Sequence, residues 1–194
     1  MSTLREPFGN RSDEVWGKLK AALQDEDALQ PGNKLVAEAG DWVVTLDLHG
    51  EAGYRSEHHY TRFRAPFVNP EGFRFTVSNQ TVFDHIGKLA GMQDIEVGHE
   101  PFDKRFLVQG NDPAKIKALF DDDRLRELVK LEPEINIVVR DAGDWFQDYY
   151  PDNVDELVVE VCGRVEDPDR LKRLYELFSR LMDGLCKVGS AYGA

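Results

Sequence analysis

The stretch His59-Tyr60-Thr61-Arg62-Phe63-Arg64-Ala65-Pro66-Phe67 decides the fold class. Apolar side chains recur at every second position over residues 63–67, with arginines and other polar groups between them. A period of two is typical of a strand with one buried face. After the turn-forming segment 69–72, the alternation resumes over residues 73–78. The pattern predicts a β-hairpin with a Phe-rich face toward the core and a polar face that carries three arginines.

Other segments give strand or helix signals of their own. Helix signals are N-cap residues, prolines at the first helical position and apolar spacings of three and four. They predict a first helix that Ser12 caps, helical residues 112–131 with a break at the three aspartates 121–123, and a final helix over 167–188. Strand signals predict a hairpin at 35–49 and strands at 102–109, 135–139 and 157–162, with 106–108 central in the sheet. Residues 81–92 are interpreted as a short helix or an irregular crossover.

These elements predict an α+β fold in a chain of 194 residues. The helices at about 112–131 and 167–188 would pack on one face of an antiparallel sheet, and the fold would also contain an N-terminal helix. We expect residues 1–11 to be a flexible N-terminus and residues 12–194 to form a single domain. The apolar stripe of the last helix favours a cover for the sheet, with a dimer seam as the alternative.

Acidic residues outnumber basic ones by 36 to 24, which gives the chain a formal net charge of −12. This charge repels phosphate backbones and anionic head groups, so we expect no nucleic acid and no membrane as a partner. No run of residues reaches the ~18 apolar positions of a membrane span, and no signal-peptide core is present. Cys162 and Cys186 are interpreted as buried thiols in a cytoplasmic protein.

Motifs of the common catalytic mechanisms do not occur in the sequence. Gly87-Lys88 lacks the upstream glycine of a phosphate-binding loop, and His99-Glu100 lacks the second histidine of a zinc protease motif. The sequence therefore favours a protein that is not an enzyme and that holds no metal and no cofactor. The histidines are interpreted as solvent-exposed or hydrogen-bonded side chains rather than metal ligands. They are His49, His58, His59, His85 and His99.

Arg62, Arg64 and Arg74 are the candidate ligand-binding residues. Three guanidinium groups on rigid strands can hold a carboxylate or a phosphate by paired hydrogen bonds. The alternative is that these arginines pair with some of the many carboxylates of the chain, or face water.

Two short sequences recur within the chain. Residues 39–42 and 142–145 both read Ala-Gly-Asp-Trp, and residues 110–117 resemble 163–172 around a shared Asp-Pro. The offsets of the two pairs differ, so one duplication does not produce both. Turn formation and helix capping select Gly-Asp and Asp-Pro independently, although a duplication stays open.

Several segments resemble an uncharacterised family of bacterial proteins of unknown function. They are YTRFRAPFVN at 60–69, GMQDIEVG at 91–98, FDKRF at 102–106, GND at 110–112 and GSA at 189–191. The resemblance spans about residues 55–192 and implies a cytoplasmic bacterial protein. It implies no activity, because none is established for that family.

The sequence thus predicts a non-enzymatic binding or protein-interaction module. A homodimer or a protein partner would bind through the C-terminal helix. The alternative is a small-ligand-binding protein or enzyme, with a pocket between sheet and helices where Arg62, Arg64 and Arg74 hold an anionic group.

Overall fold

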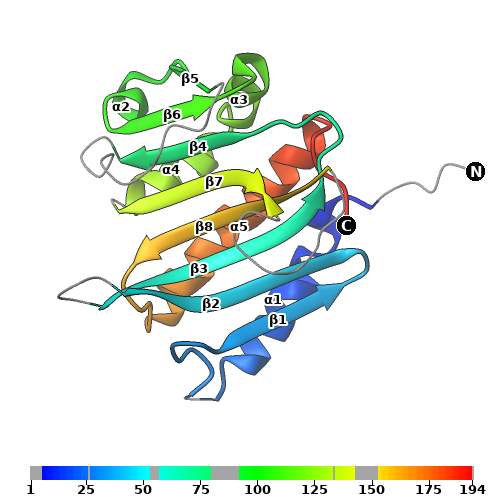
Figure 1. Cartoon of the computed structure of the whole chain (residues 1–194), viewed down its shortest axis with the longest axis vertical. Coiled ribbons are helices and arrows are strands. Elements are labelled where there is room, and N and C mark those ends of the chain that lie inside the picture. The colour runs from blue at the N-terminus through cyan, green and yellow to red at the C-terminus, as the bar shows by residue number, and fades with distance from the viewer. Residues whose placement is uncertain are drawn as a thin grey trace, which may run out of the picture.

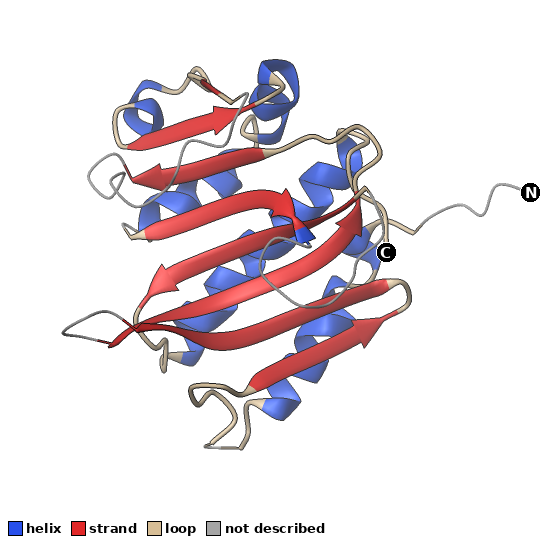
Figure 2. Cartoon of the chain, in the orientation of Figure 1, coloured by secondary structure: helices blue, strands red, loops and turns tan. Residues whose placement is uncertain are grey.

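A computed structural model describes residues 6–25, 27–52, 57–79, 92–132, 134–142 and 153–193 of the chain. Within these residues an eight-stranded antiparallel sheet carries its main helices on one face, so the predicted α+β fold is confirmed (Figures 1 and 2). The helices are η1 (Phe8–Asn10), α1 (Ser12–Ala22), α2 (Glu100–Asp103), α3 (Pro113–Leu119), α4 (Asp123–Leu131) and α5 (Pro168–Lys187). The strands are β1 (Lys34–Ala39), β2 (Trp42–Ala52), β3 (Glu57–Val68), β4 (Phe75–Asn79), β5 (Gln93–Asp94), β6 (Phe106–Gly110), β7 (Ile135–Asp141) and β8 (Val154–Cys162).

The strands lie in the order β1-β2-β3-β8-β7-β4-β6-β5. The predicted hairpin at 35–49 is confirmed as β1 and β2, whose pairing ends at Ala39 and Trp42. Gly40, the first residue of the turn between them, has a φ of 61°. A positive φ at Gly40 without one at Asp41 is the pattern of the type II′ turn, whose twist matches that of the flanking strands.

The predicted hairpin of β3 and β4 is wrong. β3 pairs with β2 and β8, and β4 pairs with β6 and β7, so two strands lie between them. The Asn69 side chain binds the backbone of Phe73 at 2.9 and 3.1 Å, and it donates to Asp155 of β8 at 2.6 Å. The turn at 69–72 is therefore anchored to the first residues of β8. The chain passes across this end of β8 on its way from β3 to β4. Alternation predicts which face a side chain takes, and it says nothing about the neighbouring strand.

Two smaller expectations also differ from the structure. Residues 102–109 are not one strand, because α2 precedes β6, and β6 lies next to the edge strand rather than at the centre. The Asp103 carboxylate accepts from three amides, those of residues 97–99, at 2.8–3.0 Å and closes the loop before α2. Ser12 is the first residue of α1 rather than its cap, and its hydroxyl contacts α5 instead.

The helices at 112–131 and 167–188 begin as predicted. Asp112 and Asp167 each cap a helix whose next residue is proline, so capping accounts for the repeated Asp-Pro. Asp122 caps α4 within the predicted break. In Figure 1, α1, α4 and α5 lie behind the sheet. The apolar stripe of α5 is buried against it, with Leu177, Phe178, Leu181 and Leu185 fully buried, so α5 covers the sheet as expected.

Phe8 lies inside the segment 1–11 that the sequence predicts to be flexible, and it is fully buried. Its ring makes edge contacts with Trp42 at 5.4 Å and with Phe178 at 6.1 Å. The Gly9 amide donates to the Asp183 carboxylate at 2.7 Å. Residues 8 and 9 are thus packed between β2 and α5.

The segment 81–91 and the turn at Gly143-Asp144 lie outside the described residues. Within the described ranges, none of the helices is long and apolar enough to cross a membrane.

Candidate functional site

Two of the three predicted arginines share one face of β3. Arg62 donates to both carboxylate oxygens of Asp47 at 2.9 Å, and the side chains are 3% and 5% exposed. Arg64 lies 3.4 Å from Asp47 and 3.4 Å from Glu156. Both guanidinium groups therefore already face buried carboxylates across β2 and β8.

Arg74 is not part of that cluster. It precedes β4 and donates to Asp155 at 2.7 and 3.0 Å and to Asp141 at 3.1 Å. These hydrogen bonds, above all those to Asp155, raise the pKa of the Arg74 guanidinium although partial burial opposes the shift. Asp155 precedes Glu156 in β8, so strand alternation directs the two carboxylates to opposite faces of the sheet. The structure brings Arg62 and Arg64 together and places Arg74 with a different set of partners.

The polar face of the sheet continues beyond the arginines as a series of cross-strand pairs. Arg140 of β7 lies 3.4 Å from Glu156, Asn136 donates to Glu160 at 2.8 Å, and Gln109 of β6 donates to Asp94 at 2.6 Å. In each of these three pairs, a guanidinium or amide group thus lies against a carboxylate of the neighbouring strand. Whether Arg62, Arg64 and Arg74 hold an anionic ligand stays a prediction, and such a ligand would compete with carboxylates already in place.

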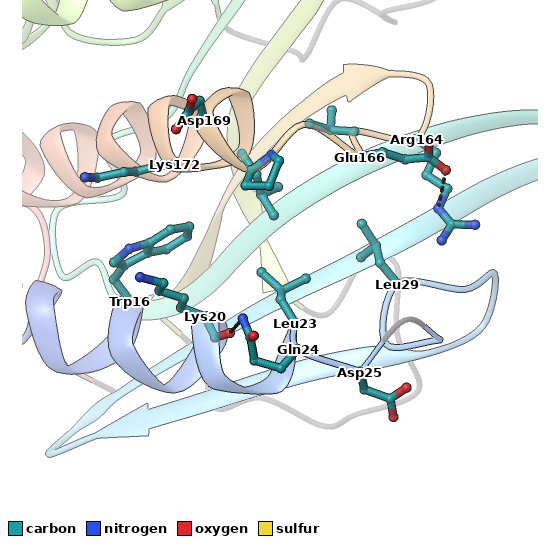
Figure 3. Close-up of a pocket in the computed structure, with 13 residues that line it drawn as sticks. Trp16, Lys20, Leu23, Gln24, Asp25, Leu29, Arg164, Glu166, Asp169 and Lys172 are labelled. Atoms are coloured by element: carbon teal, nitrogen blue, oxygen red, sulfur yellow. Dashed lines mark hydrogen bonds and ion pairs between the residues drawn. The ribbon is translucent and has the colours of Figure 1, made fainter.

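A groove formed by described residues lies on the helical side of the sheet. It consists of two adjoining hollows with volumes of about 510 and 390 Å³, and we call it the α1–α5 groove. Both hollows are lined by Trp16 of α1 and Lys172 of α5, so they meet at these two side chains. Figure 3 shows the first hollow with Lys20 on the α1 side and Lys172 on the α5 side.

The first hollow combines an apolar floor with charged walls. Its apolar residues are Trp16, Leu23, Leu29, Val165, Pro168 and Leu171. Its polar residues are Lys20, Gln24, Asp25, Arg164, Glu166, Asp169 and Lys172. Three cations face three carboxylates, so the hollow has no net charge at neutral pH. No ion pair within the described residues involves Lys20 or Lys172, whereas Arg164 lies 3.5 Å from Glu166.

Local structure fixes each wall of this hollow. Trp16, Lys20 and Leu23, the C-cap residue of α1, follow one another at spacings of four and three, which places them on one side of the helix. The Trp16 indole stacks on the Tyr175 ring of α5 at 5.0 Å. The connection from β8 to α5 is held by Thr61, whose hydroxyl donates to the Gly163 carbonyl at 2.8 Å and accepts from the Val165 amide at 2.9 Å. The groove is therefore largely preformed.

The second hollow has a floor of hydroxyl groups. The Ser12 hydroxyl lies 2.6 Å from that of Ser179 and 3.2 Å from that of Tyr175, which in turn donates to the Ser12 carbonyl at 2.6 Å. Its rim carries Glu176, which binds Arg124 at 2.9 Å, and Arg180, which binds Asp122 at 2.8 Å. The hydroxyl groups can donate and accept hydrogen bonds, and the charges of Glu176 and Arg180 are already paired.

Three titratable side chains in β8 and α5 have raised pKa values. Burial raises the pKa of Tyr175 to about 12, which keeps its phenol protonated. Partial burial raises the pKa of both Cys162 and Cys186, and Glu134 raises that of Cys162 further. Both cysteines are unpaired, Cys162 exposed rather than buried as expected, and Cys186 half-buried. A raised pKa suppresses the thiolate, which is the nucleophilic form of cysteine.

The histidines in the described part lie in β2, in β3, which holds His58 and His59, and before α2. His49 of β2 pairs with Tyr60 in the sheet, His59 of β3 pairs with Gly50, and His99 precedes α2. Within the described residues, no group of three or more histidine, cysteine, aspartate or glutamate side chains is arranged to hold a metal ion.

The comparisons with known proteins return nothing: no family model, no curated protein and no solved structure matches the chain. This outcome is consistent with the uncharacterised family that the sequence resembles. The fold and the groove therefore define the protein only as an α+β protein with a preformed recess between its first and last helices.

Sequence reasoning missed this groove. Nothing in the sequence singles out Trp16 or Lys172 as binding residues. The weak signal was a large aromatic residue with lysine four positions later on the first helix, a pattern that also fits an ordinary surface helix.

Proposed function

We propose that this protein is a non-enzymatic protein-interaction module that binds a short segment of a partner protein in the α1–α5 groove. The observation that carries the proposal is that two hollows lie next to each other along α1 and α5 and share Trp16 and Lys172 in their lining. Each hollow lies within the size range of ligand sites in proteins. A recess extended along two helices fits a chain segment better than one compact molecule.

The chemistry of the first hollow indicates what such a segment carries. An apolar side chain would enter between Leu23, Leu29 and Pro168, and it would remove apolar surface from water. An acidic side chain beside it would meet Lys20 and Lys172 next to the indole of Trp16. Tryptophan side chains at preformed pockets are among the residues that contribute most to the binding energy of protein interfaces.

Three further observations support a protein partner in the cytoplasm. The groove uses α5, the helix that the sequence predicts as the partner-binding element. The net charge of −12 disfavours nucleic acid. Both cysteines are unpaired, which fits a reducing compartment. The anion-binding alternative has less support, because carboxylates already lie against Arg62, Arg64 and Arg74.

A peptide-display selection tests the proposal. Peptides of about ten residues would be selected on the intact protein, and their affinities measured by fluorescence anisotropy. We expect enriched peptides to pair an apolar residue with Asp or Glu. Lys20→Glu and Lys172→Glu should each weaken binding about tenfold or more, because an attractive charge becomes repulsive. Trp16→Ala should weaken it further through lost contact.

Lys117→Glu is the matched control, since Lys117 is an exposed lysine on α3 outside both hollows. Circular dichroism would establish that each variant is folded. Selected peptides that bind Lys20→Glu, Lys172→Glu and Lys117→Glu equally well would contradict the proposed site. A selection that enriches no acidic peptide would contradict the proposed chemistry.

A further inference from the structure

One edge of the sheet is formed by β1, which pairs only with β2 (Figure 1). At the middle of this strand lies Val36, which is 54% exposed. Val36 and Leu131 are the two large hydrophobic residues that are exposed in the described part of the chain. Lys34 and Glu38 flank Val36 two positions away on either side, and both are exposed.

Hairpin geometry determines which backbone groups of β1 point outward. In a hairpin with a two-residue turn, the residues that flank the turn form a hydrogen-bonded pair, and such pairs alternate along the strands. Ala39 flanks the turn and pairs with Trp42. Ala39, Ala37 and Leu35 therefore bond to β2, while the amides and carbonyls of Lys34, Val36 and Glu38 point away from the sheet.

A contact on that edge agrees with this assignment. The Lys18 ammonium of α1 donates to the Glu38 carbonyl, which thus faces outward from β2. Lys18 is half-exposed and also binds Glu14. Its flexible side chain can leave the carbonyl without breaking the sheet, so it covers the edge without closing it.

The sequence of β1 is self-complementary about Val36. When two copies of β1 lie antiparallel around a two-fold axis at Val36, each Val36 faces the other. Lys34 of each copy then faces Glu38 of the other copy. In this register the outward-pointing backbone groups of residues 34, 36 and 38 are the ones that meet. The hydrogen-bonding pattern and the charge pattern therefore select the same register.

We propose that the protein forms a symmetric dimer through β1, in which the two sheets join edge to edge with Val36 on the two-fold axis. Opposite charges on facing positions of an antiparallel pair stabilise it, and like charges destabilise it. A two-fold interface is the commonest way in which identical chains associate. This proposal is independent of the α1–α5 groove, since β1 contributes no residue to either hollow.

The contact surface of one short strand is small, which predicts a weak dimer. Interfaces well below about 1,200 Å² belong to transient complexes. Dimer formation should therefore appear only toward high protein concentration, and it is measured best by sedimentation over a range up to about 500 µM.

Charge exchange at Lys34 and Glu38 tests the register. In the Glu38→Lys variant, each of the two symmetry-related pairs brings two lysines face to face. In the Lys34→Glu variant, each pair brings two glutamates face to face. Each single variant should weaken dimerisation about fivefold or more. The double variant Lys34→Glu/Glu38→Lys restores both pairs in reversed orientation, so its dimerisation constant should return close to that of the original chain.

Val36 supplies a second, independent test. Val36→Lys puts two lysines together on the axis and should abolish the dimer, whereas Leu131→Lys changes the other exposed hydrophobic residue and should not alter it. Val36→Pro removes one outward amide but none that bonds to β2. It should also abolish the dimer, with near-unchanged circular dichroism.

The outcomes separate the proposal from its alternatives. A chain that stays monomeric over the whole concentration range overturns it. A dimer that Val36→Lys leaves intact uses another surface and overturns it equally. A dimer that weakens in both single charge variants, without recovery in the double variant, refutes the register.

Discussion

The Arg62 guanidinium binds both oxygens of the Asp47 carboxylate across β2 and β3, each at 2.9 Å. Both side chains are almost fully buried. Removal of one partner from a buried ion pair leaves the other charge without compensation. We expect Asp47→Ala to lower the free energy of unfolding by about 3–5 kcal/mol, as measured by urea denaturation.

The double variant Asp47→Leu/Arg62→Met is the informative comparison. Replacement of a buried pair by apolar side chains of similar volume is often neutral. The double variant should therefore be more stable than Asp47→Ala. Lys104→Ala, which removes an exposed pair with Glu100, should leave stability nearly unchanged. A double variant as unstable as Asp47→Ala would show that the polar contacts themselves stabilise the face.

The sequence predicted the elements whose signals are local. The final helix, expected over 167–188, runs over Pro168–Lys187, and its signals are local: the Asp167 cap, Pro168 at its first position and the apolar spacing within it. The partner of β3 could not be predicted in the same way. β8 lies far along the chain, and the alternation in β3 is equally satisfied by any neighbour with an apolar face.

The same distinction between local and long-range signals applies to the candidate sites. That Arg62 and Arg64 share a face follows from a period of two, and the structure agrees. That Asp47 and Glu156 lie against them depends on strand order, which the sequence does not encode locally. The α1–α5 groove combines Trp16 with Lys172 from opposite ends of the chain. Only the packed fold brings them together.

Glu176 predicts a dependence of stability on acid. Hydrogen bonds from Arg124 lower the pKa of Glu176, although partial burial opposes the shift. The folded state thus favours the carboxylate. Its contribution is present above the ordinary value of 4.5 and is lost as the pH falls through the lowered value. Glu176→Gln should cost up to about 1 kcal/mol at pH 7 and nothing in strong acid.

Urea denaturation at a series of pH values measures this difference. Glu127→Gln is the control, because Glu127 lies 3.6 Å from the same Arg124 side chain and is 60% exposed. The charge of Glu176 is not the cause if the free energies of unfolding of Glu176→Gln and the original chain differ by the same amount in strong acid as at pH 7.

Tyr175 predicts a second dependence, in base. Burial raises its pKa from 10.0 to about 12, so the folded state keeps the phenol protonated while the unfolded chain ionises. Stability from this group is fully present below pH 10 and is lost as the pH rises to about 12. Over that range the chain should lose up to about 2–3 kcal/mol that Tyr175→Phe does not lose.

Tyrosinate absorbance provides a direct readout for the same residue. The difference between the titrations of the original chain and Tyr175→Phe should show one phenol that ionises near pH 12. If the difference between the two titrations is instead centred at the ordinary pKa of 10.0, water reaches the hydroxyl groups of the second hollow.

Two helical glycines predict opposite effects of one substitution. A methyl group at Gly184 of α5 would run into Leu119 of α3, which is buried, whereas a methyl group at Gly17 of α1 meets no atom within 4 Å. Alanine favours a helix over glycine by up to about 1 kcal/mol. Gly17→Ala should therefore raise the free energy of unfolding by about that amount. Gly184→Ala should lower it by about 1–3 kcal/mol through overpacking.

Thermal and urea unfolding of both variants measure the two effects, and Leu119→Ala separates their causes. If the clash with Leu119 is responsible, Gly184→Ala should be less harmful in the Leu119→Ala background than alone, since the smaller side chain leaves room for the methyl group. A Gly184→Ala variant as stable as Gly17→Ala would mean that α3 and α5 do not approach closely at this point. Because α5 also forms one wall of the α1–α5 groove, a shift of α5 away from α3 would change the groove as well.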